Sequence, residues 1–251
     1  MILLIDSGNT RIKVAWLGDG SLQPVLSVIH DGSLPAELLE AWESQPGPDA
    51  AWLCSVGPER IADEIDAACQ RLWQVHPFRL RPVALQAGVR NGYRDPAALG
   101  ADRWAALLGA SSLNPGPCCI VDCGTAVTLD LLDADGHHLG GQIVPGKQLM
   151  RKALGQRTAG IGEHPEGAQG IRFGTTTAEA VSAGIEQAIL ATIRRFHAEA
   201  ASLPNMTRPA LLLTGGDAPA LLPGLRDLDP IHCPDLVLRG LAVAARDPDP
   251  S

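Results

Sequence analysis

The sequence predicts an α/β protein built from two similar halves, each a mixed sheet flanked by helices. Its 251 residues are 45% hydrophobic, which is enough to bury the cores of one or two domains. Apolar runs of strand length alternate with longer segments of helical period. A strand, turn and strand at Asp6 recur at Asp122, 116 residues later, and both turns open with Asp-x-Gly. This recurrence indicates an internal duplication, and we place the halves at residues 1–113 and 114–251.

The first half opens with a predicted hairpin. Residues Met1–Asp6 form its first strand, Ser7–Thr10 its turn and Arg11–Leu17 its second strand. Alternation along the second strand places Ile12 on one face and Lys13 on the other, more polar face. An extended run, a helix, a short strand and another helix follow at Val25–His30, Leu34–Glu43, Ala51–Ser55 and Glu59–Trp73.

The second half repeats this plan. Its predicted strands are Cys118–Asp122, Val127–Leu132 and Leu139–Val144. Long helices are predicted at Thr175–Ala200 and Asp235–Ala245, and the glycine-rich stretch Gly155–Gly170 is expected to be a loop or lid. An apolar stripe on the first of these helices suits either the protein's own core or a partner subunit. The stripe consists of Val181, Ile185, Ile189 and Ile193.

Charge and hydropathy argue against nucleic-acid and membrane partners. The chain carries 20 basic and 28 acidic residues, a net charge of −8, so its average field repels phosphate backbones. Its arginines are dispersed among acidic residues without interleaved aromatic residues. The apolar run Ile2–Ile5 ends at Asp6, too soon for a signal peptide or a membrane span, and no later run reaches spanning length.

The cysteines and histidines predict neither disulfides nor a zinc site. Cys118 and Cys119 are adjacent, and the six cysteines include no C-x-x-C pair. Reduced thiols fit a cytoplasmic protein. The seven histidines are scattered, and the adjacent pair His137-His138 would point to opposite faces of a strand.

The segment Gly141–Gln148 imitates a P-loop without satisfying its chemistry. It matches most of G-x-x-x-x-G-K-[ST], but Gln148 replaces the hydroxyl that holds magnesium. Pro145 removes a backbone N–H donor, and Ile143-Val144 favour a strand. We therefore expect no P-loop here.

The two Asp-x-Gly turns are better candidates for phosphate binding. Glycine in a tight turn lets backbone N–H groups approach a polyphosphate, Asn or Thr adds donors, and the strand-end carboxylate suits a cation. Each turn alone is equally typical of an ordinary hairpin. A third segment, Leu211–Asp217, runs from an apolar strand into Gly215-Gly216, where a flat nucleoside fits against the backbone. By itself this segment is typical of a plain strand-to-helix turn.

In this order the three segments resemble the phosphate-1, phosphate-2 and adenosine motifs of the superfamily of actin, sugar kinases and heat-shock chaperones. Between the first two lies Asn91–Trp104, with a tyrosine and Gly-x-Asp-Arg, and after them comes Phe173–Gly184. With these segments the chain is similar to type III pantothenate kinases along nearly its whole length. The resemblance implies two duplicated actin-like, or ribonuclease-H-like, halves with ATP in the cleft between them.

The resemblance also implies an activity: the magnesium- and ATP-dependent phosphorylation of pantothenate to 4′-phosphopantothenate, the first step toward coenzyme A. Asp102 is then the base that accepts the hydroxyl proton. On composition alone, Asp102 is better explained as the N-cap of a helix over Trp104–Ala110. The residues implied for pantothenate are Tyr93, Gly100, Ala101, Asp102, Arg103 and Thr177.

The same resemblance implies the nucleotide and cation sites. The residues implied for ATP are Asp6, Ser7, Gly8, Asn9, Thr10, Arg11, Ile12, Lys13, Thr125, Gly215 and Gly216. Asp6 is implied to hold magnesium, and Asp122 a monovalent cation, potassium or ammonium. Ordinary turn chemistry is the alternative explanation of Asp122.

The resemblance further implies a homodimer, in which the start of the helix at Thr175–Ala200 helps to close the acceptor site. Two other functions stay open at this point. Some relatives have been described as accessory factors for virulence-gene transcription, so one alternative is a nucleotide-binding regulator of the same family. The other is a superfamily kinase for a different acceptor, such as a sugar or acetate. The presence of Asp6, Asp102, Arg103 and Thr125 favours the pantothenate kinase.

Overall fold

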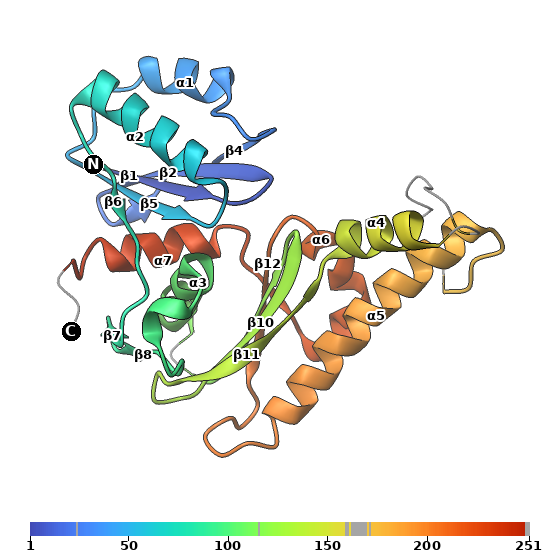
Figure 1. Cartoon of the computed structure of the whole chain (residues 1–251). Coiled ribbons are helices and arrows are strands. Elements are labelled where there is room, and N and C mark those ends of the chain that lie inside the picture. The colour runs from blue at the N-terminus through green and yellow to red at the C-terminus, as the bar shows by residue number, and fades with distance from the viewer. Residues whose placement is uncertain (24, 115, 159–160, 162–169, 171, 249–251) are drawn as a thin grey trace. The chain divides into compact units, whose positions relative to one another are not determined.

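The structure is a computed structural model that describes the chain except for residues 24, 115, 159–160, 162–169, 171 and 249–251 (Figure 1). The chain divides into two units, each with its own sheet and its own hydrophobic core. Unit 1 comprises Met1–Pro115, Gly136–His138 and Asp235–Ser251. Unit 2 comprises Gly116–Asp135 and Leu139–Pro234.

Unit 1 is organised around a mixed sheet. Its strands are β1 (Ile2–Ser7), β2 (Arg11–Gly18), β3 (Ser21–Leu22), β4 (Leu26–Ile29), β5 (Ala50–Ser55) and β6 (Phe78–Arg79). Their order is β3-β2-β1-β5-β6, and β4 also pairs with β2. Strand β1 lies antiparallel to β2 and parallel to β5. Leu3, Leu4 and Ile5 are all buried, because helices cover both faces of this central strand.

The helices of unit 1 are α1 (Ala36–Glu43), α2 (Glu59–Trp73), α3 (Ala101–Leu113) and α7 (Leu236–Ala244). The short elements β7 (Leu85–Gln86), β8 (Val89–Arg90) and η1 (Pro96–Ala98) precede α3. Helices α1 and α2 cover one face of the sheet and α3 and α7 the other (Figure 1). Helices α3 and α7 cross almost backbone to backbone, since a Cβ on Gly109 would lie 3.0 Å from the amide nitrogen of Gly240. This packing places the last helix in unit 1, whereas the predicted second half, 114–251, included it.

Unit 2 is organised around a second mixed sheet. Its strands are β9 (Cys118–Cys123), β10 (Ala126–Leu132), β11 (His138–Pro145), β12 (Ala210–Thr214) and β13 (Ile231–His232), in the order β11-β10-β9-β12-β13. Strand β9 lies antiparallel to β10 and parallel to β12, the same arrangement that β1 has with β2 and β5. The sheets therefore share the central plan that the repeated motif predicts.

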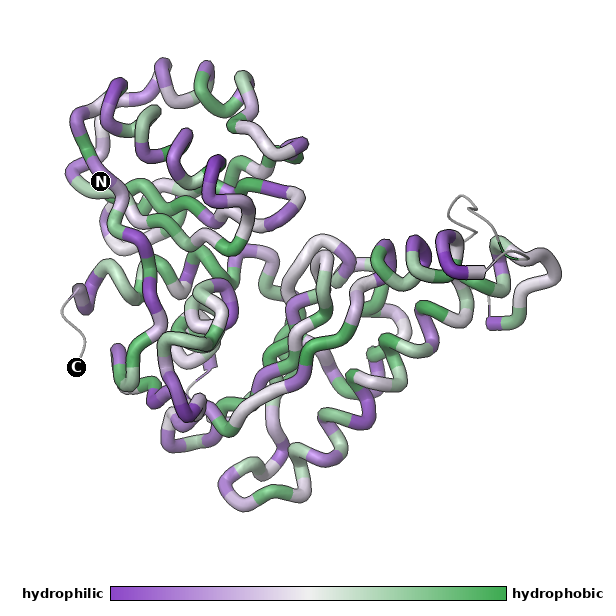
Figure 2. The backbone as a smooth tube through the Cα atoms, in the orientation of Figure 1, coloured by the Kyte–Doolittle hydropathy of each residue, from purple (hydrophilic) through white to green (hydrophobic). Residues whose placement is uncertain are grey.

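Helix α5 (Thr177–Ala200) packs against this sheet together with α6 (Ala218–Leu221) and η2 (Leu222–Leu228), and α4 (Lys147–Arg157) packs against α5. Figure 2 shows hydrophobic residues concentrated along the strands of each sheet. The predicted apolar stripe of α5 faces the core of unit 2: Ile185, Ile189 and Ile193 are buried there, and Val181 packs against them. Of the two uses expected for the stripe, the structure confirms the protein's own core.

Most predicted elements are confirmed with shifts of one or two residues at their ends, and α2 has the predicted bounds. Helix α5 begins at Thr177 rather than Thr175, because Thr176 and Glu179 form a capping box. The loop predicted for Gly155–Gly170 is wrong at its start, where α4 continues to Arg157. Residues 159–160 and 162–169 of that stretch lie outside the described residues.

Within the described residues, no helix combines the length and the apolar character needed to cross a membrane. All six cysteines lie among the described residues, and each is a buried thiol outside any disulfide.

Candidate active site

The first Asp-x-Gly turn joins β1 to β2. The Gly8 N–H donates to the Arg11 carbonyl at 3.0 Å, which leaves Asn9 and Thr10 exposed at the tip. Asp6 lies directly opposite Lys13 across the two strands. Directly opposite residues of an antiparallel pair project to the same face, so this carboxylate and this ammonium share one side of the sheet.

Two neighbouring segments support this turn from behind. The Val56 and Gly57 N–H groups donate to the Ser7 carbonyl at 3.1 and 3.3 Å, and a Cβ on Gly57 would lie 2.6 Å from the Gly8 oxygen. The buried His30 donates from Nε2 to the Gly8 carbonyl at 2.9 Å, while its Nδ1 accepts from the Gly32 N–H at 3.3 Å. No sequence motif identifies His30 as a support of the turn.

Burial separates the predicted nucleotide residues of this turn into two groups. Ile12 is fully buried in the core of unit 1, so only its backbone is available to a ligand. Arg11 is exposed and donates to Ser27 Oγ on β4 at 3.2 Å. Ser7 Oγ is buried and has no hydrogen-bond partner among the described residues. Of the predicted residues, Asn9, Thr10 and Arg11 are exposed and Asp6 and Lys13 are half-buried, so these side chains are accessible to a ligand.

The second Asp-x-Gly turn joins β9 to β10 and is one residue shorter. Its Gly124 N–H donates to the Ala126 carbonyl at 3.1 Å, and Thr125 is exposed at the tip. The pairing places Thr128 opposite Asp122, where the first turn has a lysine. The residue that shares a face with Asp122 on the neighbouring strand is thus uncharged.

Glycines bring two further segments against this second turn. Gly215 has φ +90°, and a Cβ on it would lie 2.5 Å from the Cys123 carbonyl oxygen and would also collide with Asp122 Oδ1. The Asp217 N–H donates to the same Cys123 carbonyl at 2.9 Å. The structure therefore brings together the predicted adenosine segment and the second turn. Their backbones approach closely because Gly215 has no side chain.

The segment Gly141–Gln148, which resembles a P-loop in sequence, is the end of a strand followed by the start of a helix. Residues up to Pro145 belong to β11, and α4 begins at Lys147. The Gly146 N–H donates to the Thr125 carbonyl at 3.0 Å, so the start of α4 packs on the second turn. Lys147 is only 7% exposed there, and it is not among the site residues predicted from the sequence.

The predicted base lies in the first turn of α3. The N-cap of this helix is Gly100, so the alternative explanation of Asp102 as the N-cap is wrong. Asp102 Oδ1 accepts from the Arg103 N–H at 2.8 Å. A Cβ on Gly100 would lie 2.7 Å from that oxygen, so the absence of a side chain at Gly100 leaves room for the carboxylate.

Arg103 and Tyr93 form one cluster with this carboxylate. Arg103 is 5% exposed, and its guanidinium donates to the Tyr93 hydroxyl at 2.5 Å and lies 5.4 Å from the centre of the Tyr93 ring. Asn91 shapes the loop that carries the ring, since its Oδ1 accepts from the Tyr93 N–H at 3.0 Å and its Nδ2 donates to the Pro96 carbonyl at 3.2 Å. The structure therefore places the predicted acceptor residues of unit 1 side by side.

Thr177 is the remaining residue implied for the acceptor, and it belongs to unit 2. It is the first residue of α5, directly after the N-cap Thr176. Glu179 fixes this helix end, because its carboxylate accepts from the Thr175 and Thr176 N–H groups at 2.8 and 3.2 Å. These hydrogen bonds lower the pKa of Glu179.

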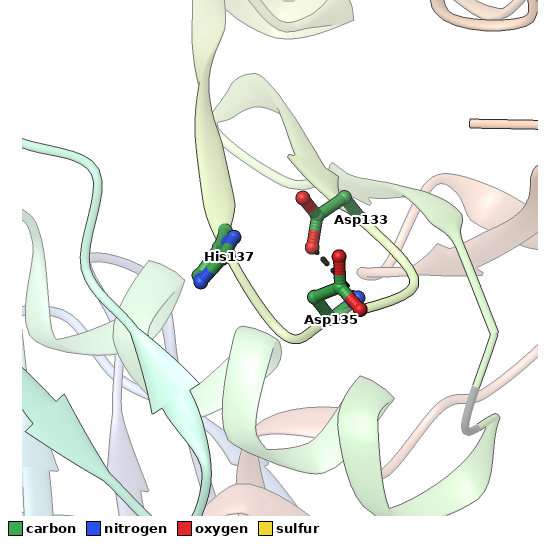
Figure 3. Close-up of side chains that lie close together, drawn as sticks. All are labelled: Asp133, Asp135 and His137. Atoms are coloured by element: carbon green, nitrogen blue, oxygen red, sulfur yellow. Dashed lines mark hydrogen bonds between the residues drawn. The ribbon is translucent and has the colours of Figure 1, made fainter. Parts of the chain in front are cut away.

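The turn after β10 gathers two carboxylates and a histidine (Figure 3). The Asp135 N–H donates to Asp133 Oδ1 at 2.9 Å, and ligand atoms of Asp133, Asp135 and His137 lie within 4.8 Å of one another. Asp135 also accepts from Asn205 Nδ2 at 3.1 Å. Hydrogen bonds of this kind are typical of an aspartate turn, so we assign no metal to it.

Comparisons with known proteins identify the family. Residues 2–199 match the sequence model of a protein family described as type III pantothenate kinase. A type III pantothenate kinase of Nitrosococcus oceani is 40% identical over 255 residues, covering 98% of this chain and 94% of the relative. That of Laribacter hongkongensis is 40% identical over 249 residues, covering 98% and 99%.

Solved structures show the same fold at lower identity. A Campylobacter jejuni protein assigned to the Baf family of transcriptional activators has a TM-score of 0.62 and 21% identity, covering 98% of this chain and 99% of its own. A Sinorhizobium meliloti protein assigned as a 2-dehydro-3-deoxygalactonokinase has a TM-score of 0.63 and 16% identity, covering 98% of each chain. These likenesses place the fold among the sugar-kinase and actin-like ATPase folds. The family match and the two close relatives show that the chain belongs to the type III pantothenate kinases.

Proposed function

We propose that the protein transfers the γ-phosphoryl group of ATP to the hydroxyl of pantothenate, the first step of coenzyme A biosynthesis. The observation that carries this proposal is the acceptor cluster of Tyr93, Asp102 and Arg103, found in a chain 40% identical to named type III pantothenate kinases. A buried guanidinium beside a phenol hydroxyl suits a small acceptor with both a carboxylate and a hydroxyl. Pantothenate is such a molecule.

The proposed chemistry assigns each residue of the cluster a separate task. Arg103 binds the pantothenate carboxylate, and Tyr93 holds the guanidinium in place. Asp102 accepts the proton of the pantothenate hydroxyl as its oxygen forms a bond to the γ-phosphorus and the bond to the ADP oxygen breaks. Gly100 leaves the carboxylate free to adopt the position seen in the structure, and Thr177 contributes to acceptor binding.

Each Asp-x-Gly turn is proposed to bind phosphate through backbone N–H groups and through Thr10 or Thr125. Lys13 adds a positive charge at the first turn, and the backbone of Gly215 and Gly216 borders the nucleoside. Asp6 is proposed to hold magnesium, which supplies neutralisation of the phosphate charge. The buried Ser7 Oγ, which has no hydrogen-bond partner among the described residues, fits a ligand rich in charge.

A monovalent cation, potassium or ammonium, is proposed at Asp122. The support is the pairing across the hairpin, where Thr128 replaces the lysine of the first turn. A weakly hydrated cation would balance the carboxylate while phosphate is bound nearby.

A homodimer is proposed through a groove beside α5 that includes the start of the apolar stripe, Val181 and Ile185. The groove has a volume of about 640 Å³ and lies between α4 and α5. Its lining is mostly apolar and includes Leu149, Ala153, Val181 and Ala188, together with Thr177. Phe173, just before α5, is 88% exposed, as expected of an aromatic residue that a second copy covers. Light scattering at assay concentration tests this: a fully active monomer would contradict it.

The activity is tested with the Asp102→Asn variant in a coupled assay that offers pantothenate, glucose and acetate in parallel. We expect turnover of pantothenate only, and a loss of about 10²–10⁴-fold in the variant with ATP binding retained. The matched control is Asp95→Asn, which changes an exposed carboxylate at the N-cap of η1 and should keep the wild-type rate. Wild-type ATP binding without turnover of any acceptor would instead favour the nucleotide-binding regulator.

A further inference from the structure

His138 lies against the acceptor cluster of unit 1. It is the first residue of β11 and is 2% exposed. Its imidazole stacks on the ring of Tyr93, with ring centres 5.8 Å apart and an angle of 18° between the planes. The same tyrosine accepts a hydrogen bond from Arg103 and lies under its guanidinium. Tyr93 thus contacts the histidine and the arginine together.

The backbone of His138 is tied to the loop that carries Tyr93. The Arg90 N–H donates to the Gly136 carbonyl at 2.9 Å, and Arg90 forms a parallel bridge with His137. Gly136 packs so closely that a Cβ on it would lie 2.6 Å from the Gly88 carbonyl oxygen. Segment 136–138 and the start of the Tyr93 loop are therefore held together by backbone contacts, so the imidazole and the phenol ring have little freedom to slide apart.

We infer that His138 is a positioning residue of the acceptor site: its imidazole fixes the plane of the Tyr93 ring, and through that ring the Arg103 guanidinium that meets the acceptor carboxylate. This inference rests on the proposed function, which makes Arg103 the partner of that carboxylate. An aromatic side chain offers a flat face that resists rotation of a stacked ring. Because the guanidinium is hydrogen-bonded to the phenol oxygen, a tilt of the ring moves the guanidinium as well.

The first test separates acceptor binding from the other steps. In His138→Ala we expect the KM for pantothenate to rise by about two- to tenfold, the effect of losing one ring contact, with the KM for ATP unchanged. His138→Phe keeps a flat ring and should restore the wild-type KM. The control for simple destabilisation is Leu38→Ala, which empties a fully buried site under α1 and should lower the melting temperature without changing the KM for pantothenate.

The second test does not depend on the reaction, because Tyr93 is the chain's only tyrosine. Ring-labelled tyrosine therefore gives NMR signals from this side chain alone. We expect His138→Ala to shift these signals and Leu38→Ala to leave them in place. Unchanged Tyr93 signals in His138→Ala, or an equal rise of the KM in both variants, would overturn the inference. A wild-type protein that does not phosphorylate pantothenate would contradict the proposed function instead, so the two failures are distinguishable.

Discussion

The two Asp-x-Gly turns share their strand arrangement and their carboxylate but differ in the residue opposite that carboxylate and in the segments that support the turn. The first turn has Lys13 opposite its aspartate and is supported by His30 and Gly57. The second has Thr128 opposite its aspartate and is supported by the backbone at Gly146 and at Gly215–Asp217. The strand pairing thus gives the carboxylate the same position in both turns, whereas the residue opposite it and the segments that support the turn differ.

The largest expected effect is the loss of stability when a substitution disrupts the glycine support of the second turn. Gly215→Ala combines a positive φ with a collision against backbone, and we expect it to lower the free energy of unfolding by about 2–5 kcal/mol. Gly57→Ala at the first turn lacks the positive φ and should cost about 1–3 kcal/mol. Gly216→Ala is the matched control, since a Cβ there meets nothing within 4 Å. Equal stability of all three variants in denaturant unfolding would show that the glycines are not structural supports.

The next largest effect is expected at alkaline pH, which should destabilise unit 2 more than unit 1. Burial raises the pKa of Cys118, Cys119 and Cys123, all on β9, from an ordinary 9.0 to about 12, and in unit 1 it does so for Cys69. A raised folded pKa means that the stabilisation is complete below pH 9 and is lost between pH 9 and 12, by about 1.4 kcal/mol per thiol and pH unit. Hydrogen exchange at increasing pH should therefore show β9 and β10 losing protection before β1 and β2. Loss in the opposite order would contradict these pKa values.

Adding a positive charge at the second turn tests the difference between the residues opposite the two aspartates, Lys13 and Thr128. Thr128→Lys copies the first turn into the second, so its ammonium should replace the proposed monovalent cation. We expect the wild type to be activated about tenfold by potassium or ammonium added to a Tris buffer, and Thr128→Lys to be nearly independent of either. Thr128→Met controls for side-chain length and should still respond to potassium. An equal wild-type rate with and without these cations would contradict the proposed cation site at Asp122.

The smallest expected effect concerns the residue after each aspartate. Both positions are buried, but one holds Ser7, whose Oγ has no hydrogen-bond partner among the described residues, and the other holds Cys123. Exchanging the residues should have opposite effects: Ser7→Cys stabilises by about 1 kcal/mol and Cys123→Ser destabilises by about 1–2 kcal/mol, because a buried hydroxyl without a partner is costly. The midpoints of urea unfolding measure both. Destabilisation by Ser7→Cys would indicate that the hydroxyl has a partner in solution.

The elements that depend on local pattern were predictable from the sequence. Helix α2 follows Pro58 and shows a clear helical period, and its bounds were predicted without error. Both hairpins alternate apolar and polar residues around a glycine turn. Helix α4 was missed because Gly146 and Pro145 precede it and Gly155 lies near its end, a composition typical of loops.

The parts of the site that depend on distant contacts were not predictable. His30 supports a turn 22 residues away, and His138 stacks on a tyrosine 45 residues earlier, without a motif for either. The N-cap of α3 was placed wrongly because Asp is a common capping residue, whereas the helix uses the backbone of Gly100. The residues that carry a family motif, Tyr93 and Arg103, do lie together as the resemblance implies.

The return of α7 to unit 1 has a consequence for synthesis on the ribosome. Multidomain chains usually fold from the N-terminus as they emerge. Here unit 2 is complete once residue 234 has emerged, but unit 1 still lacks Leu236, Leu238 and Leu241, which are fully buried in its finished form. We therefore expect the nascent chain to fold its middle first, with residues 1–115 waiting for residues 235–251 to be translated.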